Sequence, residues 1–400
     1  MKKKRILFVI DSLACAGAEK SLVTLLSLLD YTRYEVDLQL FGYGGEFEKY
    51  IPEQVTLLKP LPYMLFFKEK IWQQIKDALW KGKWKELKSK MIYSWLLRTV
   101  PNLNNAAIAR LFWEKFKDFI PPTSKHYDCA IAYAQAVPTF YVADKVCASQ
   151  KMGWVNVSYH LQGREKIYQK DFYARLDQIV LVSDSALEVF KQVYPEFASK
   201  MNIVRDMIDP IFIGKLSQLP IKLVHPTDSA CILTVARLNK SQKGYDIALK
   251  ACKILKNRGV RFRWYALGRG SYEGEMRSFI QENNLGSDFI LLGTTDNPYP
   301  YFKKADLYVQ TSRHEGFGLS IAEARLLNVP VVTTEFDAVY NQMISGENGL
   351  VVPQDPVAVA DAIERLLTDK KLYQHIVSFL KTEKKGNTEE LEKFYALIER

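Results

Sequence analysis

Short apolar runs of strand length alternate with helical patterns along nearly the whole chain, and they do so in two successive blocks. The first block opens on RILFVI at residues 5–10, and the second opens on CILTVA at residues 231–236. Continuous apolar strands between helices are typical of parallel sheets that are covered on both faces. A chain of 400 residues is also long enough to build two hydrophobic cores. We therefore expect an α/β protein made of two doubly wound, Rossmann-like domains.

Residues 208–230 mark the join between the domains, because they contain three prolines and little periodicity. We expect an N-terminal domain over residues 1–208 and a C-terminal domain over residues 209–369. The charged tail, residues 370–400, is predicted to be a helix that packs back across the join. Ligands of open parallel sheets bind beyond the carboxyl ends of the strands, so two sheets facing across a cleft would share one ligand site.

Residues 61–120 interrupt the first block with helical patterns and hold much of the chain's charge. The formal net charge is +10, and this segment has 12 Lys and Arg against 5 Asp and Glu. It also contains five of the seven tryptophans. Basic residues interleaved with aromatic ones at helical spacing favour helices lying on an anionic membrane surface. A helical subdomain with an aromatic core and solvated lysines is the alternative. Nucleic acid is disfavoured because no recognition motif accompanies the charge.

Cysteine usage and hydropathy favour a cytoplasmic protein. The five cysteines are scattered without CxxC spacing, so neither a zinc site nor a disulfide framework is indicated. A reducing compartment is then the simplest expectation. The apolar run ILFVI near the N-terminus is too short for a secretion signal. No segment approaches the roughly 20 apolar residues that a spanning helix needs.

Three loops that follow predicted strands carry residues suited to binding an anion. After the first strand, a turn of small residues opens a helix, and Gly17 would let a ligand approach the helix N-terminus. After the first strand of the second block, Arg237 and Lys243 place two cations beside another helix start, which suits a diphosphate. Gly268 forms a tight turn after the next strand. Ordinary turns and solvated surface charges are the alternatives.

A fourth loop, SRHEGFGLSIAEA at residues 312–324, is the most specific signal in the chain. Glu315 precedes a flexible Gly-Phe-Gly turn, and Glu323 lies in the helix that follows, about two turns on. Backbone N–H groups at the helix start can donate to phosphate or hydroxyl groups. A carboxylate can accept hydrogen bonds from two vicinal hydroxyls, so Glu315 suits a sugar and Glu323 suits a second diol such as a ribose. Two solvated charges flanking a helix start are the alternative.

Taken together, these segments resemble the family 4 retaining glycosyltransferases, whose members have the two-domain GT-B fold. The resemblance is carried by AGAEKS, VARLNKSQKGYD, LGRGSYEGEM, residues 289–324 and GENGLVV. It covers nearly the whole chain and is strongest over residues 230–365. The fold implied is GT-B, with parallel sheets facing across a cleft and a helical insert over residues 61–120 of the N-terminal domain.

The resemblance implies a nucleotide-sugar donor held mainly by the C-terminal domain and an acceptor held by the N-terminal domain. Arg237 and Lys243 would neutralise the donor diphosphate and, with Glu315, are the implied catalytic residues. UDP is the expected nucleotide, on the resemblance alone. The other implied donor-binding residues are Gly17, Gly268, Leu292, Gly293, Thr294, Arg313, His314, Gly316, Phe317, Gly318, Leu319 and Glu323.

Two positions depart from the family pattern. Ala16 stands where the family usually has a glycine, which narrows the first turn. Asn156 stands where related enzymes often have a histidine, and an asparagine cannot take a proton. His160 is therefore the candidate base, unless the acceptor needs no protein base. The candidate acceptor-binding residues are Asn156, His160 and Arg164.

No two aspartates are separated by a single residue, so the chain has no Asp-x-Asp motif. We therefore expect neither a metal nor a cofactor besides the nucleotide-sugar co-substrate. Arg237, Lys243 and helix dipoles would stabilise the leaving diphosphate. Transfer would retain the anomeric configuration, with the leaving diphosphate helping to deprotonate the acceptor hydroxyl.

The expected function is that of a glycosyltransferase acting on a lipid-linked or saccharide acceptor in capsule or lipopolysaccharide biosynthesis. The protein would be peripheral on the inner face of the plasma membrane. One alternative is transfer to a soluble acceptor with the insert as a lid. A second is a catalytically impaired binding or scaffold protein, which Asn156 favours. A third is a nucleotide-sugar epimerase, for which no set of acid–base residues is found. The sequence does not indicate an oligomeric state.

Overall fold

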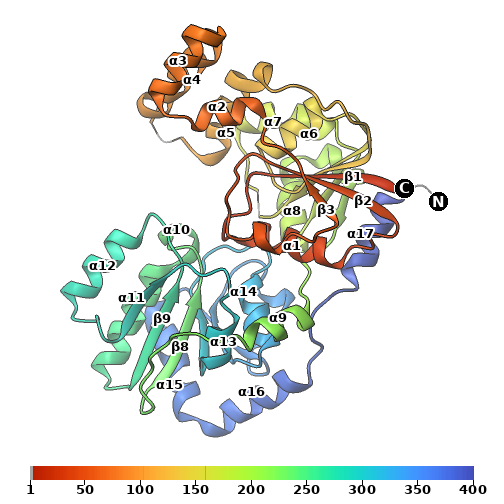
Figure 1. Ribbon diagram of the computed structural model, residues 1–400. Helices are drawn as coiled ribbons and strands as arrows, with labels where there is room; N and C mark the ends of the chain where they lie inside the picture. Colours follow the sequence, from red (N-terminus) through yellow and green to blue (C-terminus); the bar gives the residue numbers. More distant parts are fainter. Residues whose placement is uncertain (1–2, 102, 158) are drawn as a thin grey trace. The chain divides into compact units, whose positions relative to one another are not determined.

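A computed structural model describes residues 3–101, 103–157 and 159–400. The chain forms two compact units: one comprises Met1–Arg205 with Glu390–Arg400, and the other comprises Asp206–Glu389. Each unit contains one parallel sheet with helices packed around it (Figure 1). The α/β class predicted from the alternating pattern is therefore confirmed.

The N-terminal unit is built on a seven-stranded sheet with the order β3-β2-β1-β4-β5-β6-β7. Strand β1 (Lys4–Ile10) is buried from Ile6 onward and pairs in parallel with both β2 and β4. The chain thus crosses from one half of the sheet to the other after β3, and the crossover contains residues 61–120. The other strands are β2 (Tyr34–Leu40), β3 (Val55–Leu57), β4 (Tyr127–Ala132), β5 (Ala148–Val155), β6 (Gln178–Leu181) and β7 (Met201–Ile203).

Helices surround this sheet, and the crossover after β3 is itself helical. Four of the helices, α2 to α5, make up residues 62–116. The helices of the unit are α1 (Gly17–Leu28), α2 (Pro62–Lys68), α3 (Ile71–Lys81), α4 (Trp84–Thr99), α5 (Asn105–Phe116), α6 (Val137–Lys145), α7 (Gly163–Ala174), α8 (Asp184–Val193) and α17 (Glu390–Ile398), with 3₁₀ turns η1 (Glu48–Tyr50), η2 (Lys117–Phe119) and η3 (Pro195–Lys200).

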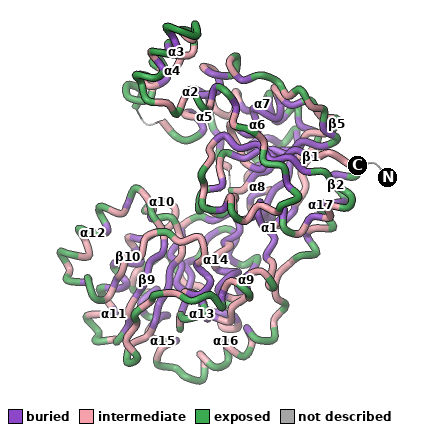
Figure 2. Tube along the Cα trace, in the orientation of Figure 1, coloured by how far each residue is buried: buried purple, intermediate pink, exposed green. Residues whose placement is uncertain are grey.

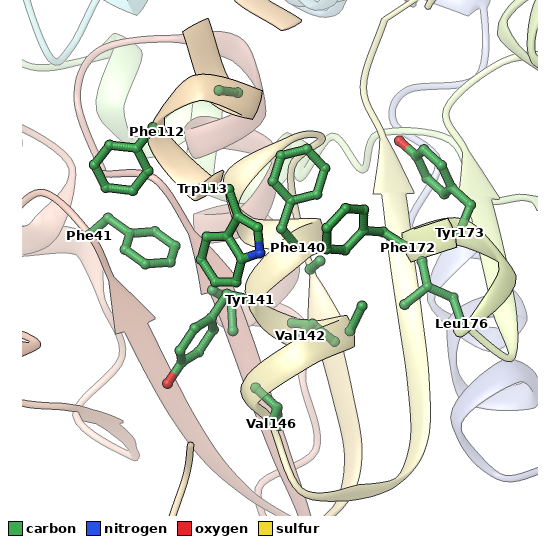
Figure 3. Close-up of a cluster of buried hydrophobic side chains, with 14 of the residues drawn as sticks. Phe41, Phe112, Trp113, Phe140, Tyr141, Val142, Val146, Phe172, Tyr173 and Leu176 are labelled. Carbon is green, nitrogen blue, oxygen red and sulfur yellow. The ribbon is translucent and has the colours of Figure 1, made fainter. Parts of the chain in front are cut away.

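An aromatic cluster joins the helical crossover to the rest of the N-terminal unit (Figure 3). Trp113 of α5 is fully buried, and its ring centroid lies 6.1 Å from that of Phe140 on α6. The Trp113 indole N–H donates to Asp144 at 2.8 Å, which satisfies its one polar atom. Phe140 in turn lies 4.3 Å from Phe172 of α7, centroid to centroid. Helix α5 therefore belongs to the same core as the sheet.

The C-terminal unit is built on a six-stranded parallel sheet with the order β10-β9-β8-β11-β12-β13. Neighbouring residues of its strands enter different cores: Ile232 packs with one cluster, whereas Cys231 and Leu233 pack with another. Because both faces of the strand are covered, its sequence is apolar at every position except Thr234. The strands are β8 (Ala230–Val235), β9 (Phe262–Leu267), β10 (Phe289–Gly293), β11 (Leu307–Gln310), β12 (Val331–Thr334) and β13 (Gly349–Val352).

The two cores of the C-terminal unit are covered by different helices. Residues of α11, α12, α15 and α16 contribute to one core, and residues of α9, α13 and α14 contribute to the other. The helices are α9 (Pro210–Ser217), α10 (Lys240–Lys243), α11 (Tyr245–Asn257), α12 (Glu273–Glu282), α13 (Tyr299–Lys304), α14 (Leu319–Leu326), α15 (Pro356–Thr368) and α16 (Lys370–Thr382), with the 3₁₀ turn η4 (Val339–Asn341).

The tail differs from the single helix predicted for residues 370–400. It forms two helices, α16 in the C-terminal unit and α17 in the N-terminal unit, so that prediction was wrong. The chain leaves helical geometry at Glu383, and Gly386 has a φ of 72° in the segment that passes between the units. Helix α16 ends where Glu383 takes an extended conformation, with a ψ of 153°, so Gly386 lies within the break and does not cause it.

Helix α17 completes the core of the N-terminal unit, although it is far from that unit in sequence. Phe394 is fully buried, and its ring lies 6.2 Å from Phe8 of β1 and 6.2 Å from Trp154 of β5. The amide of Gln150 donates to the carbonyl of Leu397 at 3.1 Å. The end of the chain is thus fixed to the middle strands of this sheet.

We predict that Phe394→Ala lowers the free energy of unfolding of the N-terminal unit by about 3–5 kcal/mol, the usual cost of emptying a buried phenylalanine site. Six of the seven tryptophans lie in this unit, so urea denaturation followed by tryptophan fluorescence reports mainly on it. Glu392→Ala, an exposed position on the same helix, is the control. Equal midpoints for the two variants would show that α17 adds nothing to this core.

Candidate functional site

Three loops meet at the carboxyl edge of the C-terminal sheet, because the strands before them are neighbours. Strands β9, β8 and β11 lie side by side in that order. The loop after β8 carries Arg237 and Lys243, the loop after β9 carries Gly268, and the loop after β11 carries Glu315. Residues separated by about 75 positions in sequence are therefore brought to one edge.

Gly244 fixes the distance between the loops after β8 and β11. It has a φ of 62°, and a Cβ at this position would lie 1.9 Å from the carbonyl oxygen of Thr311. Only glycine permits this approach. Hydrogen bonds hold the loops together: for example, Arg313 N–H donates to Gln242 O at 2.7 Å, and the Thr311 hydroxyl donates to Lys243 O at 3.2 Å. The neighbouring Lys243 side chain is thereby directed toward the loop after β11.

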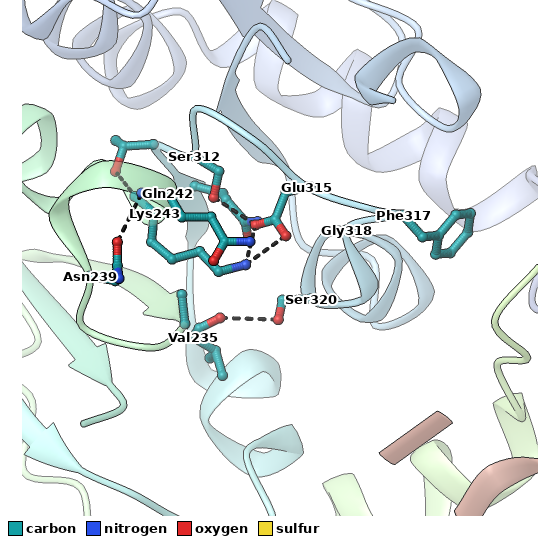
Figure 4. A network of polar contacts seen from close by, with 12 residues as sticks. Val235, Asn239, Gln242, Lys243, Ser312, Glu315, Phe317, Gly318 and Ser320 are labelled. Carbon is teal, nitrogen blue, oxygen red and sulfur yellow. Dashed lines mark hydrogen bonds and ion pairs between the residues drawn. The ribbon is translucent and has the colours of Figure 1, made fainter. Parts of the chain in front are cut away.

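Lys243 and Glu315 form a partly buried ion pair at this edge (Figure 4). The Lys243 Nζ lies 2.6 Å from both carboxylate oxygens, and the two side chains are 18% and 8% exposed. Gln310 Nε2 donates to Glu315 Oε1 at 2.5 Å, and Ser312 Oγ donates to the same oxygen at 2.7 Å. The carboxylate is therefore held by three side chains from two loops.

The hydrogen bonds around the Lys243–Glu315 pair leave positions at which the pair could still bind a ligand. Glu315 Oε1 accepts three hydrogen bonds, whereas Oε2 accepts only the one from Lys243. An ammonium group has three N–H donors, and two of them are used by Glu315. Among the described residues the pair can thus offer one acceptor position at Oε2 and one remaining donor at Nζ. A ligand with a hydroxyl beside an anionic group would match both.

The sequence placed Lys243 and Glu315 at two different parts of a ligand, whereas in the structure they also contact each other. Gln310 and Ser312 were not singled out from the sequence. Gln310 lies at the end of an apolar strand and is 2% exposed, so it resembles a misplaced core residue. The hydrogen bond from Gln310 to Glu315 depends on the turn of the loop after β11. A polar residue closing an otherwise apolar strand was the one signal that could have revealed it.

The Gly-Phe-Gly turn leads directly into α14. Gly318 is the N-cap residue with a φ of 86°, and Gln342 Nε2 donates to the carbonyls of Phe317 and Gly318. In the described part of the chain, no hydrogen bond uses the backbone N–H groups of Gly318 and Leu319. These groups and the positive end of the helix dipole favour an anion at this position.

Glu323 lies on α14 just over one turn from its first residue, Leu319, so the predicted spacing of two helical turns was too long. Residues 315–318 form the turn before α14 and are not helical, so they do not count toward this spacing. The Glu323 side chain is 2% exposed, and the Tyr299 hydroxyl of α13 lies 3.5 Å from its Oε1.

Arg313 and His314 lie in the same loop but have different surroundings. The Arg313 guanidinium makes two hydrogen bonds of 2.9 Å to Asp246 on α11 and one of 2.7 Å to Lys240 O. Burial raises the pKa of Asp246, but the hydrogen bonds and charge of Arg313 lower it more, so this pKa lies below its ordinary value. Arg313 therefore braces the loop, whereas His314 is exposed.

The remaining residues predicted in this unit lie along the same edge. Gly268 N–H donates to Gly293 O at 2.7 Å, and a Cβ on Gly268 would lie 2.0 Å from Ala236 O. This close contact aligns the loops after β8, β9 and β10. Arg237 and Thr294 are exposed, whereas Leu292 and Gly293 are half-buried, and Gly316 is buried within the turn.

The predicted residues of the N-terminal unit lie at the start of α1 and around the end of β5. Gly17 is exposed and is the first residue of α1. Asn156 Nδ2 donates to Tyr133 O at 2.8 Å, so the amide is held by the residue that follows β4. His160 is exposed, and Arg164 Nη2 lies 3.6 Å from Glu114 Oε1 on α5. Nothing in these contacts joins Asn156 to His160 within the described residues.

Two further observations concern ions and membranes. Among residues 3–101, 103–157 and 159–400, no group of three or more His, Cys, Asp or Glu side chains is arranged to hold a metal ion. In the same residues, every helix is too short or too polar to pass through a bilayer.

Comparison with solved structures identifies the fold. A TarM variant from S. aureus, crystallised with UDP among other ligands, has a TM-score of 0.69 at 14% identity, with 99% of this chain and 100% of that one covered. HepE from Anabaena, crystallised with UDP and glucose, has a TM-score of 0.67 at 17% identity, with 98% of each chain covered. The chain has the GT-B fold that the sequence predicted.

Comparison with protein families identifies the C-terminal unit. Residues 217–381 match the family described as glycosyl transferases group 1, so this part of the chain is similar to members of that family. The matched residues include Arg237, Lys243, Glu315 and Glu323. The resemblance to glycosyltransferases noted in the sequence is thereby confirmed.

Curated relatives are similar over about half of the chain. The poly(glycerol-phosphate) alpha-glucosyltransferase of Bacillus subtilis is 28% identical over 221 residues, which is 54% of this chain and 31% of the relative. The capsular polysaccharide biosynthesis glycosyltransferase CapM of Staphylococcus aureus is 28% identical over 168 residues, which is 41% of this chain and 43% of the relative. The chain thus spans less than half the length of these two relatives.

We predict that Lys243 and Glu315 behave as one energetic unit. Lys243→Met leaves a buried carboxylate without its cation and should lower the stability of the C-terminal unit by about 3 kcal/mol. The double variant Lys243→Met/Glu315→Gln should lose less than the sum of the two single variants, because it removes the uncompensated charge. Hydrogen exchange of peptides from β11 and α14 measures this locally. Additive effects would contradict the pairing.

Proposed function

We propose that the protein is a glycosyltransferase that moves a sugar from a nucleotide-sugar, with UDP as the nucleotide, to a hydroxyl of a saccharide or lipid-linked acceptor. The acceptor would belong to surface polysaccharide biosynthesis, the process named for relatives such as CapM. The observation that carries this proposal is the Lys243–Glu315 pair, set beside the free N–H groups of α14 within residues that match the group 1 family.

The charge balance of the site suggests how a donor diphosphate would bind. The Lys243–Glu315 pair is formally neutral, so the net positive charge must come from elsewhere. Arg237 is exposed after β8, and the N-terminus of α14 carries a partial positive charge. We assign attraction of the diphosphate to Arg237 and the α14 N-terminus, and assign one directed hydrogen bond to the third N–H of Lys243.

The sugar and the ribose would contact the two carboxylates. Glu315 Oε2 retains room for one sugar hydroxyl, while its Oε1 is saturated by protein donors. Glu323 would accept a hydrogen bond from a ribose hydroxyl. Gly268 and residues 292–294 would border the base.

Transfer would retain the configuration at the anomeric carbon. The bond from that carbon to the diphosphate oxygen breaks, and a bond to the acceptor oxygen forms on the same face. The acceptor proton passes to the departing diphosphate, whose negative charge Arg237 and Lys243 stabilise. We propose that these cations do the work that a metal does in other transferases. His160 remains the candidate for a protein base, because Asn156 cannot accept a proton.

Side-chain contacts restrict the position of the acceptor less than they restrict the position of the donor. Gly17 would lie against the donor, and Asn156, His160 and Arg164 would face the acceptor. We place the enzyme at the inner face of the plasma membrane as a peripheral protein, since a relative from Campylobacter jejuni is named for an acceptor on diphospho-undecaprenol. A catalytically impaired binding protein is the second candidate function, favoured by Asn156.

A donor screen tests the proposal. UDP-sugars should raise the melting temperature of the full-length protein without added metal, and GDP- and ADP-sugars should raise it less. The Glu323→Ala variant should lose most of this stabilisation, because a ribose contact is removed. Slow hydrolysis of the same donor would distinguish an enzyme from an impaired binding protein. No stabilisation by any donor would contradict the proposal.

Lys243→Ala should reduce turnover at saturating donor by roughly 10²–10³-fold, the effect of removing a major electrostatic donor. The matched control is Lys240→Ala, because Lys240 is an exposed lysine of the same short helix, α10. The assay follows release of the free nucleotide diphosphate. Near-normal turnover of Lys243→Ala would remove Lys243 from the mechanism.

A further inference from the structure

The helical hairpin formed by α3 and α4 (residues 71–99) presents large apolar side chains to solvent. Trp72 and Trp80 of α3 are 79% and 82% exposed, and Trp84 and Trp95 of α4 are 53% and 62% exposed. Figure 2 shows that much of this hairpin is exposed along its length. Tryptophans this exposed are unusual in a protein that places its other three, in β5, β9 and α5, at 1% exposure or less.

Helix α3 is oriented with its polar side inward. Gln74 is fully buried, and its amide donates to the carbonyls of Phe66 and Glu69 at 2.8 and 2.9 Å. Asp77 is 3% exposed and lies 3.1 Å from Lys81. The apolar side, which includes Trp72, faces away from the protein. Gln74 caps the end of α2, so the inverted orientation is fixed by specific hydrogen bonds.

Helix α4 has an apolar stripe of its own. Trp84, Met91 and Trp95 are spaced seven and four residues apart, which places them on one side of a helix. All three are more than half exposed. Leu87 and Tyr93 of the same helix are buried in the core of the unit. The exposed side chains of the stripe are therefore separate from those that fix α4 to the protein.

The exposed charged residues around these two apolar stripes are all cations. The acidic residues of segment 68–98 are Glu69, Asp77 and Glu86, and each is buried or half-buried. Every charged residue of this segment that is fully exposed is a cation. These are Lys68, Lys70, Lys76, Lys81, Lys85, Lys88 and Arg98.

We propose that the α3–α4 hairpin is a membrane-docking surface, whose tryptophans enter the interface of an anionic bilayer and whose lysines bind the lipid headgroups. Tryptophan is favoured at such interfaces, and lysines near the surface are attracted by anionic lipids. The helices have 11 and 16 residues, or about 17 and 24 Å, and their charge favours lying in the plane of the membrane. A second copy of the chain fits poorly, because two cationic surfaces would face each other.

This inference deepens the proposed peripheral location but does not depend on catalysis. The test is sedimentation of the full-length protein with vesicles of neutral lipid alone or of neutral and anionic lipid mixed. Wild-type protein should bind only the anionic vesicles, and high salt should release it. Trp72→Ala/Trp80→Ala should weaken binding at least tenfold, because two interfacial anchors are lost. Lys76→Gln and Lys85→Gln should each weaken it about fivefold.

Leu219→Ala/Val224→Ala is the matched control, since both residues are exposed apolar side chains of the other unit. The thermal unfolding of the tryptophan variant should equal that of wild type, because neither removed side chain is buried. Equal vesicle binding by wild type and the tryptophan variant would overturn the proposal. So would a wild-type dimer that dissociates in the variant while neither binds vesicles. The tryptophan variant should hydrolyse the donor in solution as wild type does. A failure of the membrane-docking proposal can therefore be distinguished from a failure of the proposed activity.

Discussion

The candidate site depends on one ion pair between loops that are distant in sequence. Lys243 and Glu315 come together because β8 and β11 are neighbours and because Gly244 lets the two loops touch. Gln310 and Ser312 then saturate one carboxylate oxygen and leave the other available. A partly buried pair of this kind is expensive to form unless its hydrogen bonds are complete. The geometry of the loops after β8 and β11 therefore serves chiefly to complete the hydrogen bonds of this ion pair.

Most of the fold could be predicted because both faces of each central strand are covered. Residues of β8 alternate between two cores, so the strand is apolar apart from Thr234 and its pattern is visible in the sequence. Strand β3 carries little signal in the sequence, because it has three residues and only Val55 is buried. The break in the tail was not predicted, because α16 ends at an extended Glu383 in a segment rich in helix-forming charges.

The residue types of the site could be predicted from the sequence, but the contact between Lys243 and Glu315 could not. A cation after one strand and a carboxylate after another indicated an anion and a polyol, and the topology brings both to one edge. Their direct contact depends on side-chain geometry that spacing does not encode. The hairpin in residues 71–99 shows the same limit, since periodicity predicts an amphipathic helix but does not say which side is buried. In α3 it is the polar side, held by Gln74.

The most direct test of the account is hydrogen exchange of the full-length protein with and without UDP. The account predicts slower exchange in residues 236–244 and 313–323, because the ligand would order the loops after β8 and β11 and the start of α14. Exchange in the α3–α4 hairpin should not change. Protection confined to other segments, or none at saturating UDP, would contradict the claim that the Lys243–Glu315 edge holds the donor.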